Sequence, residues 1–353
     1  MNYRDEFEKI VENIKVNRNT LPEEFNQKMQ PMIQFIQNNI PNQLYKFRSC
    51  TEYSLDAFEK DEIWLANASL FNDLHDSLLF LDKPTILEHA KKVFAPENAA
   101  TLFKYIKQYQ EPLENLKFAD SNMRTFIRNG LDALDERTFL DKVQQILPGL
   151  DAFLETSFSA IREEIRGHIK MACLSESIKS PLMWAHYADN HKGFAIGYDF
   201  RDNDISQCSN CPNRSCGNIK LATIYPIIYS DKRFDATSYG QWRVEQYMKE
   251  CIGILPEGSY EDEFLFTKAA LNKSNDWKYE NEWRIICSTP NQAIEQKNRY
   301  PIIKPPVAIY LGCQIPDIYR KLLIHIADMK GIAKYQMIVK DYSHAYELDY
   351  KPL

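Results

Sequence analysis

A long block without strand signals, from Pro84 to about Arg166, divides this sequence into two unequal parts. Apolar residues recur in the block at three- to four-residue spacing, which predicts amphipathic helices. The parts before and after it contain short runs rich in branched and aromatic residues, which predict strands. We therefore expect a helical insertion at 84–166 within one core domain formed by 42–83 and 167–353.

Residues 1–41 form an N-terminal helical segment, in which Pro31 is expected to kink or split the helix. Strands are expected at 44–48, 63–68, 169–175, 193–200, 219–229, 282–288 and 307–313, and further helices at 52–60, 180–188, 240–252, 261–272 and 316–329. The expected fold class is α+β, with a mixed, mostly antiparallel β core, flanking helices and the helical insertion.

Charge and hydropathy exclude several classes of protein. The chain has 353 residues, a formal net charge of -6 and a pI near 5.8. This balance argues against a surface that binds nucleic acid everywhere, although a local basic groove is compatible with it. The first ten residues carry several charges and no apolar run, and the longest apolar runs elsewhere are only strand-sized. We expect a cytoplasmic protein that does not associate with a membrane.

Two glutamates, Glu280 and Glu282, stand one residue apart in the motif WKYENEWR. In an extended chain this spacing points both carboxylates to the same face. Two carboxylates at one rim can divide the work of positioning a nucleophile and stabilising positive charge on a sugar carbon. Trp277 and Trp283 surround the pair and offer stacking surfaces for a planar ligand. The alternative is a polar strand edge whose carboxylates pair with neighbouring basic residues.

The motif LYKFR is expected to form a strand that places Lys46 and Arg48 on one face. A cationic pair on a strand suits phosphate or pyrophosphate, and Tyr45 offers a further stacking surface. The alternative is a solvated strand face. The next expected strand leads into a polar loop that contains Ser69, Asn72, Asp73, His75 and Asp76. Turn formation and helix capping explain one or two of these residues, which leaves the others as candidate ligand contacts.

The motif MWAHYADNHKG is expected to form a helix that ends with Gly193 as its cap. His186 and His191 are five residues apart, which differs from the four-residue spacing that favours zinc binding by two histidines. We therefore expect a structural helix end, with His186 and Tyr187 lining a cleft.

Three cysteines, Cys208, Cys211 and Cys216, form the pattern C-x2-C-x4-C in a polar loop. This spacing indicates a candidate structural zinc knuckle, which needs a fourth ligand from elsewhere in the chain. Cys251 or a histidine is a candidate for this fourth ligand, whereas Cys50, Cys173, Cys287 and Cys313 lie in or next to apolar runs and are expected to be small core residues.

Taken together, the motifs LYKFR, FNDLHD, MWAHYADNHKG and WKYENEWR resemble those of a widespread prokaryotic family of unknown function. The likeness spans roughly residues 44–350 apart from the insertion, and includes a serine-glutamate pair, Ser175 and Glu176, at a strand end. It departs from the family in the loop, where Leu74 and His75 replace the usual proline-hydrophobic pair.

A more distant likeness is to the ADP-ribosyltransferase superfamily, which implies a split β core. By this likeness Arg48 would hold the phosphates or ribose of NAD, and Ser69 would lie beside the nicotinamide ribose. Glu282 would be the catalytic carboxylate, and Glu280 would orient the acceptor. The remaining candidate nucleotide contacts are Tyr45, Lys46, Asn72, Asp73, His186, Tyr187, Trp277 and Trp283.

These observations predict an NAD-consuming enzyme, either ADP-ribosyltransferase-like or a glycohydrolase, with NAD as its substrate and a protein or nucleic acid as the acceptor of any transfer. The biological setting that we consider is that of a bacterial toxin or phage-defence effector. One alternative is a metal-dependent nuclease or phosphoesterase that uses the acidic residues and His186. Another is a non-enzymatic nucleotide-binding module. A homodimer is the expected assembly.

Overall fold

The computed structural model of the chain describes residues 2–17, 19–93, 95, 97–98, 103–104, 135–201, 222–251, 259–287, 299–340 and 344–353. The described strands form a ten-stranded sheet, which consists of β1 (Leu44–Arg48), β2 (Glu62–Asn67), β3 (Lys170–Ser175), β4 (Phe194–Tyr198), β5 (Ala222–Pro226), β8 (Glu282–Cys287), β9 (Arg299–Ile303), β10 (Ala308–Leu311), β11 (Ala333–Val339) and β12 (Leu348–Pro352). A smaller sheet pairs β6 (Ile228–Ser230) with β7 (Asn272–Ser274).

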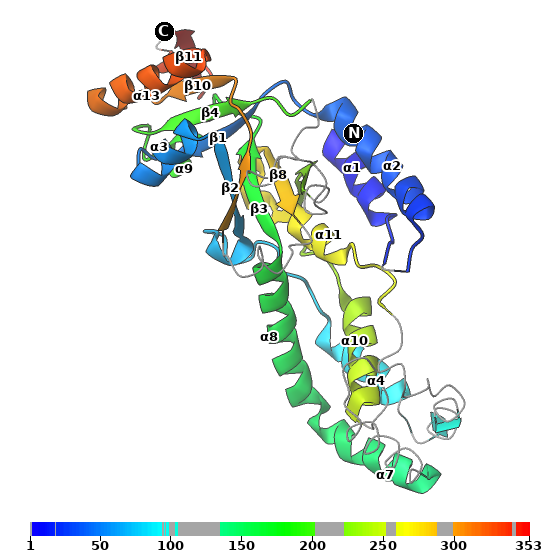
Figure 1. Ribbon diagram of the computed structural model, residues 1–353. Coiled ribbons are helices and arrows are strands. Elements are labelled where there is room, and N and C mark those ends of the chain that lie inside the picture. Colours follow the sequence, from blue (N-terminus) through cyan, green and yellow to red (C-terminus); the bar gives the residue numbers. More distant parts are fainter. Residues whose placement is uncertain are drawn as a thin grey trace, which may run out of the picture.

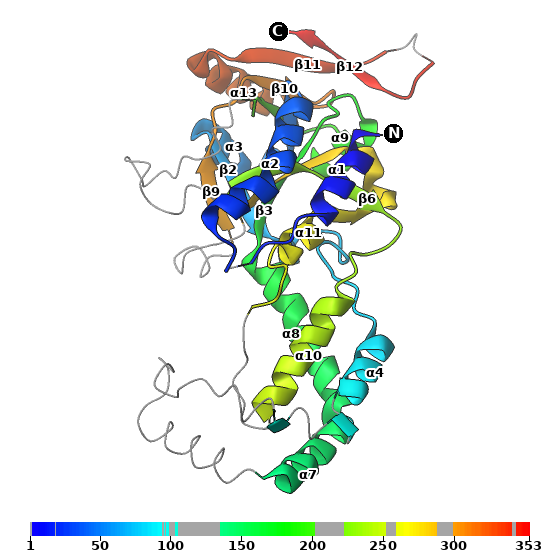
Figure 2. The same ribbon diagram turned by 90° about the vertical axis from the view of Figure 1, so that its right-hand side faces the viewer.

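The described helices are α1 (Tyr3–Glu12), α2 (Pro22–Asn39), α3 (Glu52–Glu59), α4 (Lys83–Val93), α7 (Glu136–Ile146), α8 (Leu150–His168), α9 (Pro181–Tyr187), α10 (Thr237–Cys251), α11 (Leu265–Leu271) and α13 (Asp317–Lys330). Helices α4, α7, α8 and α10 form a projection that extends away from the sheet (Figures 1 and 2). Helix α10 packs against α4 in this projection, although the sequence analysis assigned its residues to the core domain. None of the described helices combines the length and the apolar character that a membrane crossing requires.

The large sheet is mixed and mostly antiparallel, as expected for an α+β fold; among its described pairs only β10 and β11 run parallel. It runs in the order β12-β11-β10-β4-β1-β3-β2-β9, and β8 and β5 branch from it at β3. The C-terminal strands β11 and β12, at one edge of this order, did not appear among the strands expected from the sequence.

The sheet opens beside β3, because two strands, β1 and β2, pair with different parts of the same edge of β3. Along the other edge β3 pairs with β8 over its whole length. On the shared edge, β2 pairs with Lys170 and Met171, whereas β1 pairs with Ser175. Among the described strands none pairs with this edge between those points, and the Lys46 ammonium donates a hydrogen bond of 2.7 Å to the carbonyl of Cys173 there. The core is therefore split between β1 and β2.

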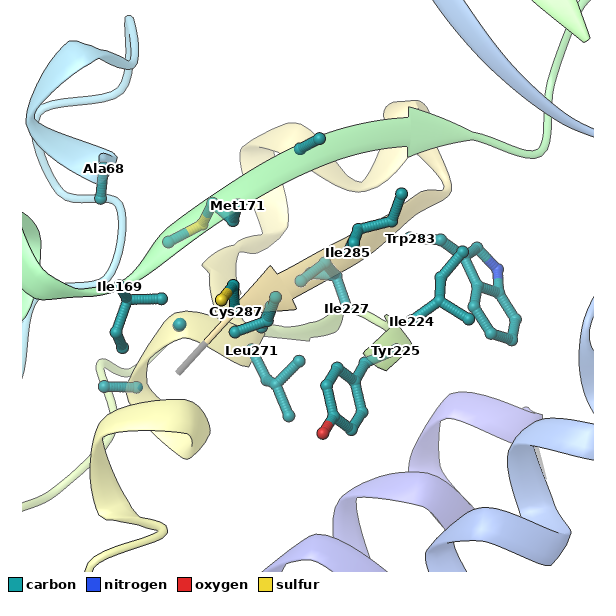
Figure 3. Close-up of a cluster of buried hydrophobic side chains, with 14 of the residues drawn as sticks. Ala68, Ile169, Met171, Ile224, Tyr225, Ile227, Leu271, Trp283, Ile285 and Cys287 are labelled. Carbon is teal, nitrogen blue, oxygen red and sulfur yellow. The ribbon is translucent and has the colours of Figure 1, made fainter. Parts of the chain in front are cut away.

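Two clusters of buried side chains cover the sheet. The larger one includes Trp283 and Ile285 of β8 together with Phe7 of α1 and Leu271 of α11. Figure 3 shows part of this cluster, in which Trp283, Ile285 and Leu271 lie among other apolar side chains. The second cluster contains Trp184 of α9, whose ring meets the edge of Phe47 on β1. Burial of these large side chains fixes β1 and β8 from both sides.

The N-terminal segment folds as two helices, but the break is not at Pro31, which lies inside α2. Helix α1 ends with Asn13 as its cap, and α2 begins at Pro22. A proline at the first helical position sacrifices no hydrogen bond, because that backbone N–H has no partner within the helix in any case. The second helix therefore begins at Pro22, and Pro31 does not divide it.

Candidate functional site

A cavity of about 440 Å³ lies at the opening of the sheet and brings together residues of the motifs LYKFR, FNDLHD, MWAHYADNHKG and WKYENEWR. Its lining includes these residues that the sequence analysis singled out: Tyr45, Lys46, Arg48, Asn72, Asp76, Ser175, His186, Tyr187, Glu280 and Glu282. Phe47, Phe71 and Lys273 also line it. The volume lies within the range of about 300–1,000 Å³ that is typical of small-molecule sites.

Glu280 and Glu282 converge through a turn, because the chain between them is not extended. Glu280 ends a 3-10 helix, Asn281 adopts the left-handed conformation with φ 45°, and Glu282 begins β8. Asparagine is one of the few residues that tolerate this conformation. Lys273 donates hydrogen bonds to both carboxylates, with 2.8 Å between its Nζ and Glu282 Oε2. The expected extended geometry was wrong, but the two carboxylates do lie side by side.

Arg284 fixes Glu282 from the other side. The guanidinium is completely buried and donates through Nε to Glu282 Oε1 at 2.6 Å. Its other nitrogens contact both carboxylate oxygens of Asp76, at 2.8 and 2.6 Å, and the carbonyl of Ala270 at 2.7 Å. Burial alone would favour a neutral Glu282, but the positive charges of Arg284 and Lys273 hold its pKa well below the usual range. Glu282 is therefore ionised at neutral pH.

Glu280 has a different environment. The hydroxyl of Tyr187 donates to Glu280 Oε1 at 2.5 Å, while Lys273 contacts the other oxygen. Burial, together with the nearby negative charge of Glu282, raises the pKa of Glu280 to about 7. The two carboxylates thus differ in protonation near neutral pH. Such a division is typical of sites that use one group for proton transfer and the other as a fixed charge.

Two cations from β1, Lys46 and Arg48, line the same cavity as the carboxylates. Burial and the neighbouring charge of Arg48 lower the pKa of Lys46 to about 8. Both side chains are partly exposed to the cavity, and the backbone between them packs through Phe47 into the second cluster of buried residues. This arrangement provides positive charge for an anionic group of a ligand.

Four of the predicted contacts lie elsewhere. Ser69 is exposed in a 3-10 turn and does not line the cavity; its neighbour Leu70 does. Asp73 and Trp277 line a second, smaller cavity of about 250 Å³, which shares Lys273 with the first.

Trp283 is the fourth of these residues and belongs to the core (Figure 3). Its ring stacks on Tyr3 with 6.5 Å between the centroids, and its Nε1 donates to Glu176 at 2.6 Å. Because side chains alternate along a strand, Trp283 points away from the face that carries Glu282 and Arg284. It therefore offers no stacking surface to a ligand in the cavity.

Helix α9 ends at Tyr187, so Gly193 is not its cap. Asp189, Asn190 and His191 adopt positive φ values and turn the chain toward β4. Gly193 has a different role, because a Cβ atom at this position would lie 2.1 Å from the carbonyl oxygen of Arg48. The glycine permits the close approach of this turn to the end of β1.

The predicted zinc ligands Cys208, Cys211 and Cys216 lie outside the described residues. Within the described residues, no group of three or more histidine, cysteine, aspartate or glutamate side chains is arranged to hold a metal ion. Of the other cysteines whose side chains the structure describes, Cys287 is buried, whereas Cys50, Cys173 and Cys313 are only partly buried, and these four are free thiols.

Residues 183–285 match the model of a family described as "Protein of unknown function (DUF2971)". The matched segment runs from α9 to β8 and includes Tyr187, Lys273, Glu280 and Glu282. This match confirms the resemblance to a family of unknown function over residues 183–285. No curated protein and no solved structure matched the chain. The likeness to ADP-ribosyltransferases stays a prediction.

Proposed function

We propose that the cavity binds NAD and cleaves the bond between nicotinamide and ribose, as a glycohydrolase or as an ADP-ribosyltransferase. The observation that supports this most strongly is that Lys46 and Arg48 line the same cavity as Glu280 and Glu282. Cations on β1 suit the diphosphate of NAD, and a carboxylate pair suits the ribose carbon at which positive charge develops. Tyr45 and Tyr187 supply aromatic walls.

Hydrolysis would break the bond between ribose C1′ and the nicotinamide nitrogen. The electron pair of this bond would leave with nicotinamide. Water then forms the new bond to C1′ and transfers a proton to Glu280, which passes it to solvent, so the products are nicotinamide, ADP-ribose and a proton. In transfer, an acceptor replaces water. The fixed charge of Glu282 stabilises the positive charge on the ribose.

Glu280 is the better candidate for direct contact with the substrate, whereas the distant likeness implies that Glu282 is the catalytic carboxylate. Both oxygens of Glu282 are held by charged partners, Arg284 and Lys273, whereas one oxygen of Glu280 contacts Lys273 and the other accepts from the neutral hydroxyl of Tyr187. Glu280 has a pKa of about 7, so it can accept a proton near neutral pH. Tyr187 and Lys273 hold its carboxylate in place.

The nuclease alternative has less support from the geometry. Two of the carboxylates that it would need, Asp76 and Glu282, already share the buried guanidinium of Arg284. A metal ion would have to compete with this guanidinium for the same oxygens.

The purified protein should release nicotinamide from NAD at a rate that EDTA does not change. Glu280→Gln should abolish the release, whereas Glu347→Gln, at an exposed glutamate, should not. Nucleic-acid cleavage that EDTA stops would support the nuclease instead. Saturable NAD binding without turnover, with and without a mixture of protein acceptors, would identify a binding module.

A further inference from the structure

The N-terminal helix α1 reaches the carboxylate pair through Arg4. This side chain is buried, with 5% of its surface exposed. Its guanidinium donates to the backbone carbonyl of Glu282 at 2.9 Å, to the carbonyl of Ile227 at 2.7 Å and to the carboxylate of Glu176 at 2.6 Å. A planar guanidinium suits such a set of acceptors because its N–H groups diverge in a fixed fork.

The turn from Glu280 to Glu282 is held through its backbone by several separate elements. The carbonyl of Glu280 accepts from the hydroxyl of Ser175 at 2.5 Å, and that of Asn281 accepts from the N–H of Glu176 at 3.1 Å. The N–H of Glu282 donates to the hydroxyl of Tyr229 at 2.7 Å. The remaining carbonyl, that of Glu282, accepts from Arg4 and also from the N–H of Ile227 at 3.0 Å.

Glu176 links these contacts to α1. One oxygen of its carboxylate accepts from Arg4, from Trp283 and, in a short contact, from the hydroxyl of Tyr3. The serine-glutamate strand end thus has a structural role, since Ser175 and Glu176 together hold the turn that carries the carboxylates. Helix α1 lies outside the segment that matches the family model.

Helix α1 has a hydrophobic attachment that does not depend on Arg4. Phe7 and Val11 are buried in the main core, with 0% and 2% of their surfaces exposed. Removing the guanidinium therefore leaves the apolar face of the helix in place. Loss of the guanidinium should chiefly affect the groups that accept its hydrogen bonds, which are the carbonyls of Ile227 and Glu282 and the carboxylate of Glu176.

We infer that Arg4 is a positioning residue for the site: by holding the carbonyl of Glu282 and the carboxylate of Glu176, it fixes the turn that directs Glu280 and Glu282 into the cavity. Its effect on turnover rests on the proposed function. Its effect on the position of the carboxylates does not, because that position can be measured without any substrate.

The test compares Arg4→Met and Arg4→Lys with Lys28→Met, which removes an exposed charge from α2. The readout is the carboxyl ¹³C NMR signals of Glu280 and Glu282, assigned with the glutamine variants at each position. Arg4→Met should shift both signals, and Lys28→Met should leave them unchanged. Unchanged signals in Arg4→Met would overturn the inference. If that variant fails to fold by circular dichroism, Arg4→Lys carries the same test, because an ammonium lacks the fork of donors.

NAD turnover gives the second readout. A misplaced carboxylate should lower kcat by about 10- to 100-fold, with KM changed less than about twofold. An unchanged kcat in a folded Arg4→Met variant would also overturn the inference. If the unaltered protein shows no turnover, the proposed function fails while the NMR comparison still decides the role of Arg4.

Discussion

The ammonium group of Lys273 lies 2.8 Å from Glu282 and also contacts Glu280. One buried cation therefore serves two carboxylates, which together carry more negative charge than it can neutralise. Of the two glutamates, Arg284 contacts only Glu282, and it also pairs with Asp76. This unequal sharing explains why Glu282 stays ionised while Glu280 titrates near neutral pH.

Lys273→Met should raise the pKa of Glu280 above its value of about 7, because the lysine charge favours the ionised carboxylate. Glu280 would then be mostly protonated at neutral pH and turnover would fall. The NMR titration of the Glu280 carboxyl carbon measures the change directly. Lys278→Met is a control, because Lys278 is exposed in the 3-10 helix that ends at Glu280. An unchanged Glu280 titration in Lys273→Met would contradict the prediction.

The two glutamates should differ in their effect on stability. Glu282→Gln removes a fully buried charge from beside Arg284 and Lys273, and breaking such a pair costs about 3–5 kcal/mol. Glu280→Gln removes a group that is already partly neutral near pH 7, and we expect a loss of about 1–2 kcal/mol, typical of a perturbed hydrogen bond. Urea unfolding of both variants measures the two free energies. A larger loss for Glu280→Gln would contradict the assignment of roles.

The activity should have a bell-shaped dependence on pH. Glu280 has a raised pKa of about 7, so the carboxylate form, which accepts the proton, accumulates as pH increases through that value. Lys46 has a lowered pKa of about 8, so its positive charge disappears as pH increases further. We therefore expect kcat to increase on the acid side and KM for NAD to increase on the alkaline side.

Lys46→Met tests the second half of this dependence. Without the titrating amine, KM should be high at all pH values and should lose its increase above pH 8, while the acid side of kcat stays in place. If KM still increases above pH 8 in this variant, a group other than Lys46 causes the increase.

The positions of β1 and β8 were predictable because alternation and burial are local properties of a sequence, whereas β9, β11 and β12 were not expected. The motif LYKFR formed β1, and EWRIIC formed β8, with Trp283 in the core and Glu282 on the opposite face. The alternation rule itself places these two neighbours on opposite faces, so Trp283 and Glu282 could not both have met one ligand. The sequence was therefore sufficient to remove Trp283 from the site.

The partners of the carboxylates were not predictable in the same way, because they depend on pairing between distant segments. Asp76 and Arg284 lie 208 positions apart, and only the fold brings them together. Lys273 lies outside the motif WKYENEWR, which begins at Trp277. Its contact with both glutamates required the left-handed Asn281, which no local pattern had indicated.

Gly193→Ala should disturb the cationic side of the cavity. A Cβ atom at this position would lie 2.1 Å from the carbonyl oxygen of Arg48 and 2.9 Å from that of Ala188, so the backbone has to move. We expect a loss of about 1–3 kcal/mol, as for an overpacked site, together with weaker NAD binding because Arg48 is displaced. Thermal unfolding and a binding titration measure these effects. Gly149→Ala is the control, since a Cβ atom there meets nothing within 4 Å and its φ is not positive. Equal effects of the two substitutions would show that contact with the Arg48 backbone does not decide the outcome.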